Sequence, residues 1–264
     1  LQRISALKER LRKSNAQLDA YRHNSERELG MARELMEHMV KGASTSLPDV
    51  DLWLQPAANL GGDLLITQKC KCEIEYLLLA DAMGHGLSAA IPLVPLVQVF
   101  SDMTSMCKPV PEIVREMNLR ISNVLPAGNF VAVTLISMDR RNRLLKIWNG
   151  GNPPLLLADG SGKVTHKFNS RHLALGILRG DDFDDSTESF SWDNECRLTL
   201  YSDGLADATN EKGVEFGESG IIAAIQCDSP HHCLKVAIAT HLGDYGARDD
   251  ISLATVKLHK PQAS

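Results

Sequence analysis

Four aspartates in this sequence each stand beside glycine or at the edge of a segment with the composition of a β-strand. They are Asp63 after Gly61-Gly62, Asp81 before Gly84, Asp203 before Gly204, and Asp249 before the last apolar run. Strands from distant parts of a chain can end at one edge of a sheet, where clustered carboxylates repel one another unless a cation neutralises them. Oxygen ligands suit Mg²⁺ or Mn²⁺, whereas Zn²⁺ prefers His or Cys. We therefore expect a site for two divalent cations, which can hold a phosphate and activate water.

The turn after Asp81 has the composition of a phosphate-binding loop. Gly84 and Gly86 flank His85, so the backbone can bend tightly or approach a ligand where a Cβ would clash. Free N–H groups in such a turn can bind phosphate oxygens. The alternative is an ordinary strand–turn–helix junction in which Asp81 caps the turn. For His85, substrate contact and a structural role in the turn are both open.

Hydrophobic periodicity predicts the elements that must position these residues. We expect strands at 51–57, 63–69, 73–81, 130–138, 143–148, 155–158, 196–202 and 251–258, and helices at 87–107, 111–125, 217–226 and 230–241. Pro92 and Pro95 lie inside the first of these helices, although each removes a backbone hydrogen bond there. Segment 170–191 has the weakest pattern, and its aspartates are expected to form a solvated loop rather than a calcium site.

Residues 1–42 read as one long helix, and 43–264 as a separate domain that begins at a turn-forming segment. Heptad spacing places apolar residues along an imperfect coiled-coil seam, which favours a parallel homodimer. The seam includes Leu7, Leu11, Leu18, Leu35 and Met39. The apolar stripe broadens near the end of the helix, so part of it is expected to pack on the following domain. The alternative is a plain amphipathic helix lying on its own domain.

The overall composition is that of a globular protein, with 44% apolar and 23% charged residues. Residues 1–42 carry nine basic and six acidic side chains, a net charge of +3. Because the whole chain has a net charge of −5, the remaining residues carry −8. An acidic body argues against nucleic acid as a partner. No apolar run approaches the roughly 20 residues of a membrane span. The six scattered cysteines are interpreted as reduced thiols, which together with the missing span indicates a cytoplasmic protein.

Six motifs in order resemble the SpoIIE-like branch of the type 2C (PPM) serine/threonine protein phosphatases. They are Gly61-Gly62-Asp63, the segment 81–86 (DAMGHG), 149–154 (NGGNPP), 173–177 (LALGI), 200–204 (LYSDG) and 249–252 (DDIS). Each motif alone is weak, whereas six in the family order are specific. The resemblance covers about residues 52–258, which is nearly everything after the long helix.

The resemblance implies an α+β fold in which two mainly antiparallel sheets pack face to face between helices. It implies that Asp81 bridges two Mn²⁺ or Mg²⁺ ions and that Ala82 offers its backbone carbonyl as a further ligand. Asp203 and Asp249 would complete one metal and Asp63 would support the other. Metal-activated water would be the nucleophile, and Asp250 ranks below Asp249 as a ligand.

Two departures from the family pattern stand out. Gly151 occupies the place where the branch usually has histidine, and no arginine precedes Gly61-Gly62-Asp63 to hold the substrate phosphate. Phosphate capture would then fall to the metals and the turn 84–86.

The resemblance also implies partners. The substrate class is a phosphoserine or phosphothreonine on a small regulatory protein such as an anti-sigma-factor antagonist. The long helix would connect an upstream receiver or sensor domain to the phosphatase and control its metal site. Two other functions stay open: a phosphatase-like binding module that sequesters a partner, and a metal-dependent hydrolase of small phosphoesters.

Overall fold

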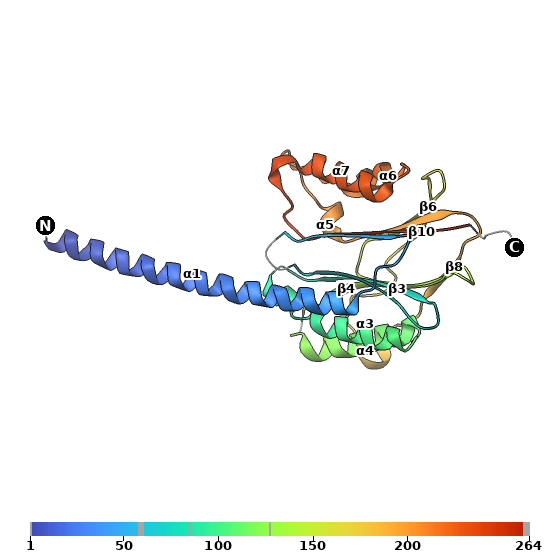
Figure 1. The fold of residues 1–264 in the computed structure, drawn as a ribbon, viewed down its shortest axis with the longest axis horizontal. Helices are drawn as coiled ribbons and strands as arrows, with labels where there is room; N and C mark the ends of the chain where they lie inside the picture. Colours follow the sequence, from blue (N-terminus) through green and yellow to red (C-terminus); the bar gives the residue numbers. More distant parts are fainter. Residues whose placement is uncertain (1, 58–60, 85, 127, 261–264) are drawn as a thin grey trace.

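The chain forms two stacked five-stranded sheets with helices on both outer faces (Figure 1). The computed structural model describes residues 2–57, 61–84, 86–126 and 128–260, with side chains from residue 9 onward. The first sheet has the order β1 (Val50–Gln55), β10 (Ile251–Leu258), β9 (Cys196–Tyr201), β6 (Leu155–Asp159) and β7 (Val164–Phe168). The second has the order β2 (Asp63–Lys69), β3 (Glu75–Ala82), β4 (Val131–Asp139), β5 (Leu144–Gly150) and β8 (Glu188–Ser191). Neighbouring strands in both sheets pair antiparallel.

Helices cover the outer face of each sheet, which gives four layers and confirms the expected α+β sandwich. The second sheet is covered by α2 (Leu87–Ala90), α3 (Leu93–Ser105) and α4 (Val110–Val124). The first sheet is covered by α5 (Asp203–Ala206), α6 (Gly217–Ile225) and α7 (Pro230–Leu242). Two short 3₁₀ turns lie at Gly180–Asp182 and Gly243–Tyr245.

Three apolar cores lie between these layers, and β3 shows how one strand serves two of them. Successive side chains of a strand point to opposite faces of the sheet. Leu77 and Leu79 therefore pack between the two sheets, while Tyr76, Leu78 and Ala80 pack against α3 and α4. A strand buried on both faces reads as a continuous apolar run. The residues before Asp81 therefore do not alternate between apolar and polar side chains.

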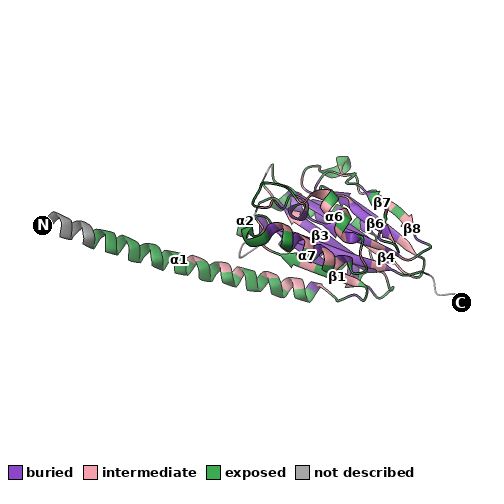
Figure 2. Cartoon of the chain, turned by 90° about the horizontal axis from the view of Figure 1, so that it is seen from above, coloured by how far each residue is buried: buried purple, intermediate pink, exposed green. Residues whose placement is uncertain are grey.

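The N-terminal helix α1 (Gln2–Ala43) projects away from the sandwich, and only its last turns contact it (Figures 1 and 2). Met36, Met39 and Val40 pack against the core beside α3 and β2, as the broadening stripe predicts. The seam residues Leu11, Leu18 and Leu35 are 63%, 58% and 67% exposed in the single chain. The side chain of Leu7 lies outside the described residues. The coiled-coil dimer stays a prediction.

The two prolines after the central turn split the expected helix 87–107 into two. Pro92 lies at the junction between α2 and α3, and Pro95 is the third residue of α3. N–H groups in the first turn of a helix have no partner within the helix, so proline costs no hydrogen bond there. Leu87–Ser105 is long and apolar enough for a membrane span by composition, but half of that stretch is buried inside the fold. Its apolar residues serve the core.

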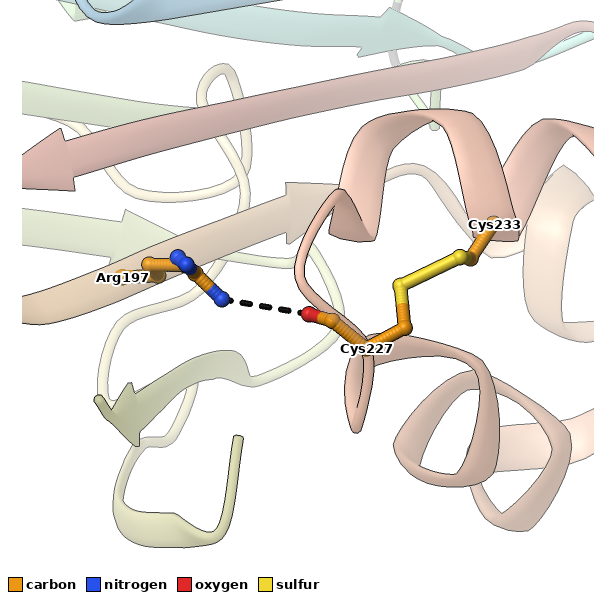
Figure 3. Close-up of a disulfide and its surroundings, with 3 residues drawn as sticks. All are labelled: Arg197, Cys227 and Cys233. Atoms are coloured by element: carbon orange, nitrogen blue, oxygen red, sulfur yellow. Dashed lines mark hydrogen bonds between the residues drawn. A yellow bond between two sulfur atoms is a disulfide. The ribbon is translucent and has the colours of Figure 1, made fainter. Parts of the chain in front are cut away.

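A disulfide joins Cys227 and Cys233, so the expectation of six reduced thiols is wrong at these two positions (Figure 3). The turn between α6 and α7 reverses the chain after Cys227, which brings the first turn of α7 beside the end of α6. Arg197 of β9 donates to the carbonyl of Cys227 at 3.1 Å and fixes the same turn to the sheet. The other four cysteines are free.

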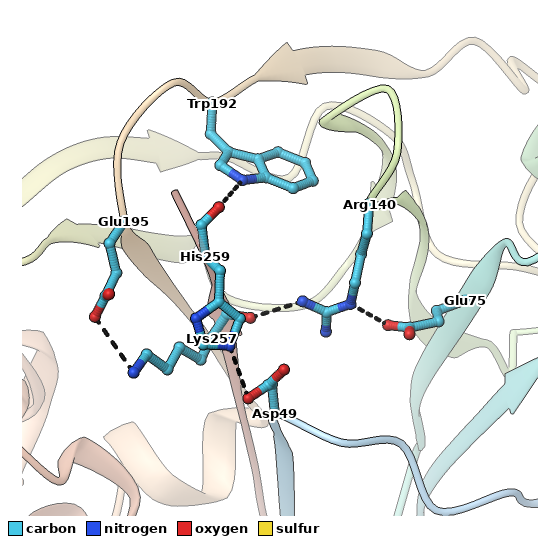
Figure 4. Close-up of polar contacts among 7 residues, drawn as sticks. All are labelled: Asp49, Glu75, Arg140, Trp192, Glu195, Lys257 and His259. Carbon is cyan, nitrogen blue, oxygen red and sulfur yellow. Dashed lines mark hydrogen bonds and ion pairs between the residues drawn. The ribbon is translucent and has the colours of Figure 1, made fainter. Parts of the chain in front are cut away.

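A polar network joins the two sheets at the end where β3 begins (Figure 4). Arg140, in the turn after β4, donates from Nε to Glu75 of β3 at 2.7 Å and from Nη1 to the carbonyl of Lys257 of β10 at 2.9 Å. His259 contacts Asp49 at 2.9 Å. The Glu75 carboxylate is almost fully buried, so this end of the sandwich depends on a buried ion pair.

Candidate metal and phosphate site

The site begins with two aspartates that face each other on neighbouring strands of the second sheet. Asp63, the first residue of β2, is directly opposite Asp81, near the end of β3. Directly opposed residues have Cβ atoms about 4.5–5.5 Å apart. Asp63 is buried, and its Oδ2 has no hydrogen-bond partner among the described residues. A buried carboxylate oxygen without a donor is costly, and a bound cation would satisfy it.

The first sheet supplies two more aspartates from adjacent strand ends. Asp203 follows β9 and Asp249 precedes β10, and these strands pair antiparallel. The backbone N–H of Ser202 donates to the carbonyl of Ser252 at 3.1 Å, which carries the pairing up to the site. A Cβ on Gly204 would lie 2.1 Å from the carbonyl oxygen of Asp250, so glycine is required where the two ends meet. Asp203 and Asp249 are exposed.

The aspartates of both sheets affect one another electrostatically. Burial raises the pKa of Asp63 to about 7, with Asp250 and Asp203 adding repulsion and the hydroxyls of Ser252 and Ser202 opposing it. Burial raises the pKa of Asp81 to about 9, and the charges of Asp63, Asp203 and Asp249 add to it. Such mutual repulsion requires that the carboxylates share one region.

Asp203 is tied to Asp81 directly. Loss of hydration at the site raises the pKa of Asp203, while a hydrogen bond from the carboxyl of Asp81 acts in the opposite direction. The two carboxyls are thus close enough to interact directly. A divalent cation would relieve the repulsion among these carboxyls, and oxygen-only ligands fit Mg²⁺ or Mn²⁺.

Asp250 plays a part that the sequence analysis missed. Its Oδ1 accepts from the N–H of Ala57 at 2.8 Å, and its Oδ2 accepts from the N–H of Gly62. With both oxygens engaged and only 3% of the residue exposed, Asp250 anchors the loop that carries Asp63. The pair Asp249-Asp250 is the only signal in the sequence.

The backbone around Ala82 is open because Gly62 has no side chain. The N–H of Ala82 donates to the carbonyl of Gly62 at 2.9 Å. A Cβ on Gly62 would lie 2.7 Å from the Ala82 carbonyl oxygen and 3.0 Å from that of Gly84. Gly62 thus leaves room beside the carbonyl that is expected to be a ligand.

The glycines of the central turn have the backbone that the sequence suggests. Gly84 has φ 91° and Gly86 has φ 80°, both in the left-handed region that favours glycine. Gly86 also precedes α2 and accepts from the N–H groups of Ala89 and Ala90. His85 lies outside the described residues, so its proposed contact with substrate stays a prediction.

The loop 149–154 is a support rather than a source of ligands. Asn152 donates to the hydroxyl of Thr134 at 3.0 Å, and Asn149 donates to the carbonyl of Pro153. Gly151 has φ 94°, and a Cβ there would lie 3.0 Å from the methyl groups of both Ala132 and Ala174. Glycine therefore suits this position, where any larger side chain would press on both methyl groups.

The chain is similar to known phosphatases in both sequence and fold. A family model described as stage II sporulation protein E (SpoIIE) matches residues 76–259. The phosphoserine phosphatase RsbP of Bacillus subtilis (strain 168) is 26% identical over 194 residues, which are 72% of this chain and 47% of RsbP. The chain therefore spans about half the length of this curated relative.

Two solved structures share the fold. The SiaA-PP2C domain of Pseudomonas aeruginosa superposes with a TM-score of 0.77 at 18% identity, over 90% of this chain and 98% of that domain. RsbX, solved in complex with magnesium, gives a TM-score of 0.60 at 12% identity, over 81% of this chain and 98% of RsbX.

Proposed function

Since this chain belongs to the SpoIIE family of PP2C-type phosphatases, we propose that it hydrolyses phosphoserine or phosphothreonine on a regulatory protein. The observation that carries the proposal is the gathering of Asp63, Asp81, Asp203 and Asp249 from two sheets at one end of the sandwich. The phosphoserine activity named for RsbP supports the same class of reaction.

We assign two divalent cations, Mn²⁺ or Mg²⁺, to this cluster. The ions would be held by Asp63, Asp81, Asp203, Asp249 and the backbone carbonyl of Ala82. When bound, the ions supply Lewis acidity that activates water and neutralises phosphate charge. The magnesium in RsbX supports this choice of cation class.

Other residues of the protein bind the phosphate and position the metal ligands. The backbone N–H groups of Gly84 and Gly86 are assigned to the phosphate, and both glycines have the positive φ that a tight binding turn requires. Asp250 fixes the position of Asp63 through the loop 57–62. No cysteine or serine nucleophile is needed, so the reaction proceeds without a phosphoenzyme.

The proposed substrate is an anti-sigma-factor antagonist or a similar small phosphoprotein in the cytoplasm. The basis is the motif resemblance together with the similarity to RsbP. A folded substrate requires more contact surface than a metal cluster offers, since specific protein interfaces bury about 1,200–2,000 Å². A homodimer would enlarge that surface.

Regulation is proposed to act through α1. Its last turns contact β2, which carries Asp63, and α2, which follows the phosphate turn. A shift of α1 driven by an upstream receiver or sensor domain would therefore move elements that hold the site. The exposed Leu11, Leu18 and Leu35 would pair in the dimer and transmit that shift.

A binding module without activity is the second candidate, because α1 and the sandwich could sequester a partner. The retention of four mutually repelling carboxylates disfavours it. An aryl phosphate assay separates the two functions: the phosphatase gains activity with Mn²⁺ or Mg²⁺ and loses it with a chelator. Equal inactivity under all conditions, with partner binding retained, would favour the binding module.

A further inference from the structure

Three cysteines from two separate parts of the chain form a cluster that the phosphatase chemistry does not use. The sulfur atoms of Cys70, Cys72 and Cys107 all lie within 4.8 Å of one another. Cys70 follows β2, Cys72 lies in the turn between β2 and β3, and Cys107 lies just after α3. Their sequence spacing gives no metal motif, because the third cysteine is 35 residues beyond the second.

The cluster is remote from the carboxylate site. It lies at the opposite ends of the two strands that carry Asp63 and Asp81. Seven residues of β2 at about 3.3 Å each separate the two sites by roughly 20 Å. A ligand at the cysteines is therefore independent of the catalytic cations.

Both chain segments are held in place by contacts other than the sulfurs. In the hairpin turn, Cys70 donates to the carbonyl of Ile74 at 2.9 Å, and Glu73 donates to that of Cys70 at 3.0 Å. After α3, Cys107 has φ 57° and donates to the carbonyl of Thr104 at 2.9 Å. A site whose backbone is fixed in advance loses little entropy when it binds a ligand.

Two side-chain hydrogen bonds fix these segments to each other. The Tyr76 hydroxyl donates to the carbonyl of Lys108 at 2.9 Å, beside Cys107. The Thr104 hydroxyl donates to Oε1 of Gln68, two residues before Cys70. The position of α3 relative to the hairpin is thus set without any bond between the sulfurs.

The chemistry of the cluster is that of a soft metal ligand set. Thiolates select Zn²⁺ or Cu⁺ over hard cations. Zn–S bonds of about 2.3 Å in a tetrahedron bring sulfurs about 3.8 Å apart. The present spacing therefore needs to close by about 1 Å at most. Cys70 is buried, Cys107 is half-buried and Cys72 is exposed, so a fourth position is open to water.

An ordinary core role explains only part of the cluster. Cys70 and Cys107 pack with the apolar core beneath α3 and α4, where small apolar residues would serve equally well. Cys72 lies exposed at the tip of a turn, yet its sulfur is directed at the other two. Core packing therefore does not explain a cysteine at position 72, because an exposed turn residue makes no necessary apolar contact.

We propose that Cys70, Cys72 and Cys107 form a binding site for a thiophilic divalent cation, Zn²⁺, with water as the fourth ligand. The three thiols lose their protons as the cation binds, so no redox partner is needed. The bound ion would clip the β2–β3 hairpin to the link between α3 and α4.

The test uses Co²⁺ as a spectroscopic probe on the reduced full chain. We expect one equivalent to give thiolate-to-cobalt absorption in the near ultraviolet, which Zn²⁺ displaces. Cys72→Ser, a change at an exposed position, should remove this absorption and weaken Zn²⁺ binding at least 10-fold. Cys196→Ser, which alters a buried free cysteine outside the cluster, is the matched control and should retain it.

One further variant makes the result decisive. Asp203→Ala should retain the thiolate absorption, because its carboxylate belongs to the other site. Absence of the absorption in the reduced wild-type chain, or its full retention in Cys72→Ser, would overturn the proposal. The proposal would also be overturned if mass spectrometry of the reduced sample showed that two of the three cysteines remain joined by a disulfide and no metal is bound.

Discussion

The carboxylate of Asp250 accepts a hydrogen bond from the backbone N–H of Gly62, and 188 residues of chain separate the two. The same side chain also accepts from Ala57, so one buried aspartate of the first sheet holds the loop that leads into the second. Asp63 directly follows Gly62 in the chain, and Asp249 directly precedes Asp250. The relative position of the sheets at the site therefore depends on Asp250.

Asp250→Asn should impair the site without removing any expected ligand. The amide retains one acceptor but directs an NH₂ group at a backbone donor, which costs about 1–3 kcal/mol of unfolding free energy. We expect lower activity that excess Mn²⁺ partly restores. Asp249→Asn is the matched control: it should weaken metal binding with little change in stability. If urea denaturation gives the two variants equal stability, the anchoring role of Asp250 is wrong.

Stability of the metal-free protein should fall as pH rises. The pKa values of Asp63 and Asp81 are raised to about 7 and about 9 from the ordinary value of 3.8. Between pH 4 and 9 the folded state then holds more protons than the unfolded state, so unfolding becomes easier as pH increases. Added Mn²⁺ should abolish the trend, because the cation replaces the protons.

The measurement is urea denaturation at pH 5 and pH 8 in the presence of a chelator. Asp81→Asn should reduce the difference between the two pH values, since one of the shifted groups is gone. A metal-free wild type that is more stable at pH 8 than at pH 5 would contradict the proposed repulsion.

Gly86→Val should reduce phosphate turnover through the backbone of the turn. A Cβ at Gly86 meets no atom within 4 Å, so the cost comes from the backbone alone. Gly86 has φ 80° and ψ −159°, a region essentially restricted to glycine, where a side chain costs about 1–3 kcal/mol. Gly213, with φ 75° and equally open space, provides the matched control. Both valine variants should lose similar stability, but only Gly86→Val should lose activity. Equal activity in the two would refute a role of this turn in binding phosphate.

Arg140→Ala should destabilise the sandwich from the end away from the site. It leaves the Glu75 carboxylate buried without its partner, which costs about 3–5 kcal/mol. Arg120→Ala, which removes an exposed pair with Glu116, should cost only about 0.3–0.5 kcal/mol. Thermal unfolding of both variants checks the contrast, and Glu75→Gln should recover part of the loss in Arg140→Ala.

Leu18→Glu should dissociate the proposed dimer and leave the phosphatase domain folded. Leu18 is 58% exposed in the single chain, so its charge penalty arises only if a second helix covers it. Sedimentation analysis should show a dimer for the wild type and a monomer for the variant. Arg10→Glu, an exposed change off the seam, should remain dimeric. A monomeric wild type would refute the coiled coil for this chain.

Local sequence signals predicted most of the elements but few of the contacts between them. The strands β2 and β10 match the expected 63–69 and 251–258, because both are apolar runs bounded by aspartate or glycine. The strands β7 and β8 were missed, since short edge strands such as Glu188–Ser191 alternate polar residues without a long apolar run. Their pairing is decided by the neighbouring strand rather than by their own composition.

In the candidate site, too, the sequence predicted individual residues but not the contacts between distant parts of the chain. Motif resemblance identified Asp63 and Asp81, and the structure places them opposite each other. The role of Asp250 was not predictable, because its partners lie 193 and 188 residues away and are backbone groups without a sequence signature. The three-cysteine cluster was missed for a similar reason, since Cys107 reaches the hairpin only through the packing of α3.

Phosphate release from a phosphoserine protein by the wild type and by Asp203→Ala tests the central claim most directly. Both are assayed with saturating Mn²⁺ and again after chelation, with Asp193→Ala, an exposed aspartate at the far end of the sandwich, as the matched control. We predict metal-dependent release by the wild type and Asp193→Ala, and a loss of at least 100-fold in Asp203→Ala. Undiminished release by Asp203→Ala, or release that survives chelation, would contradict the two-sheet carboxylate site as the catalytic centre.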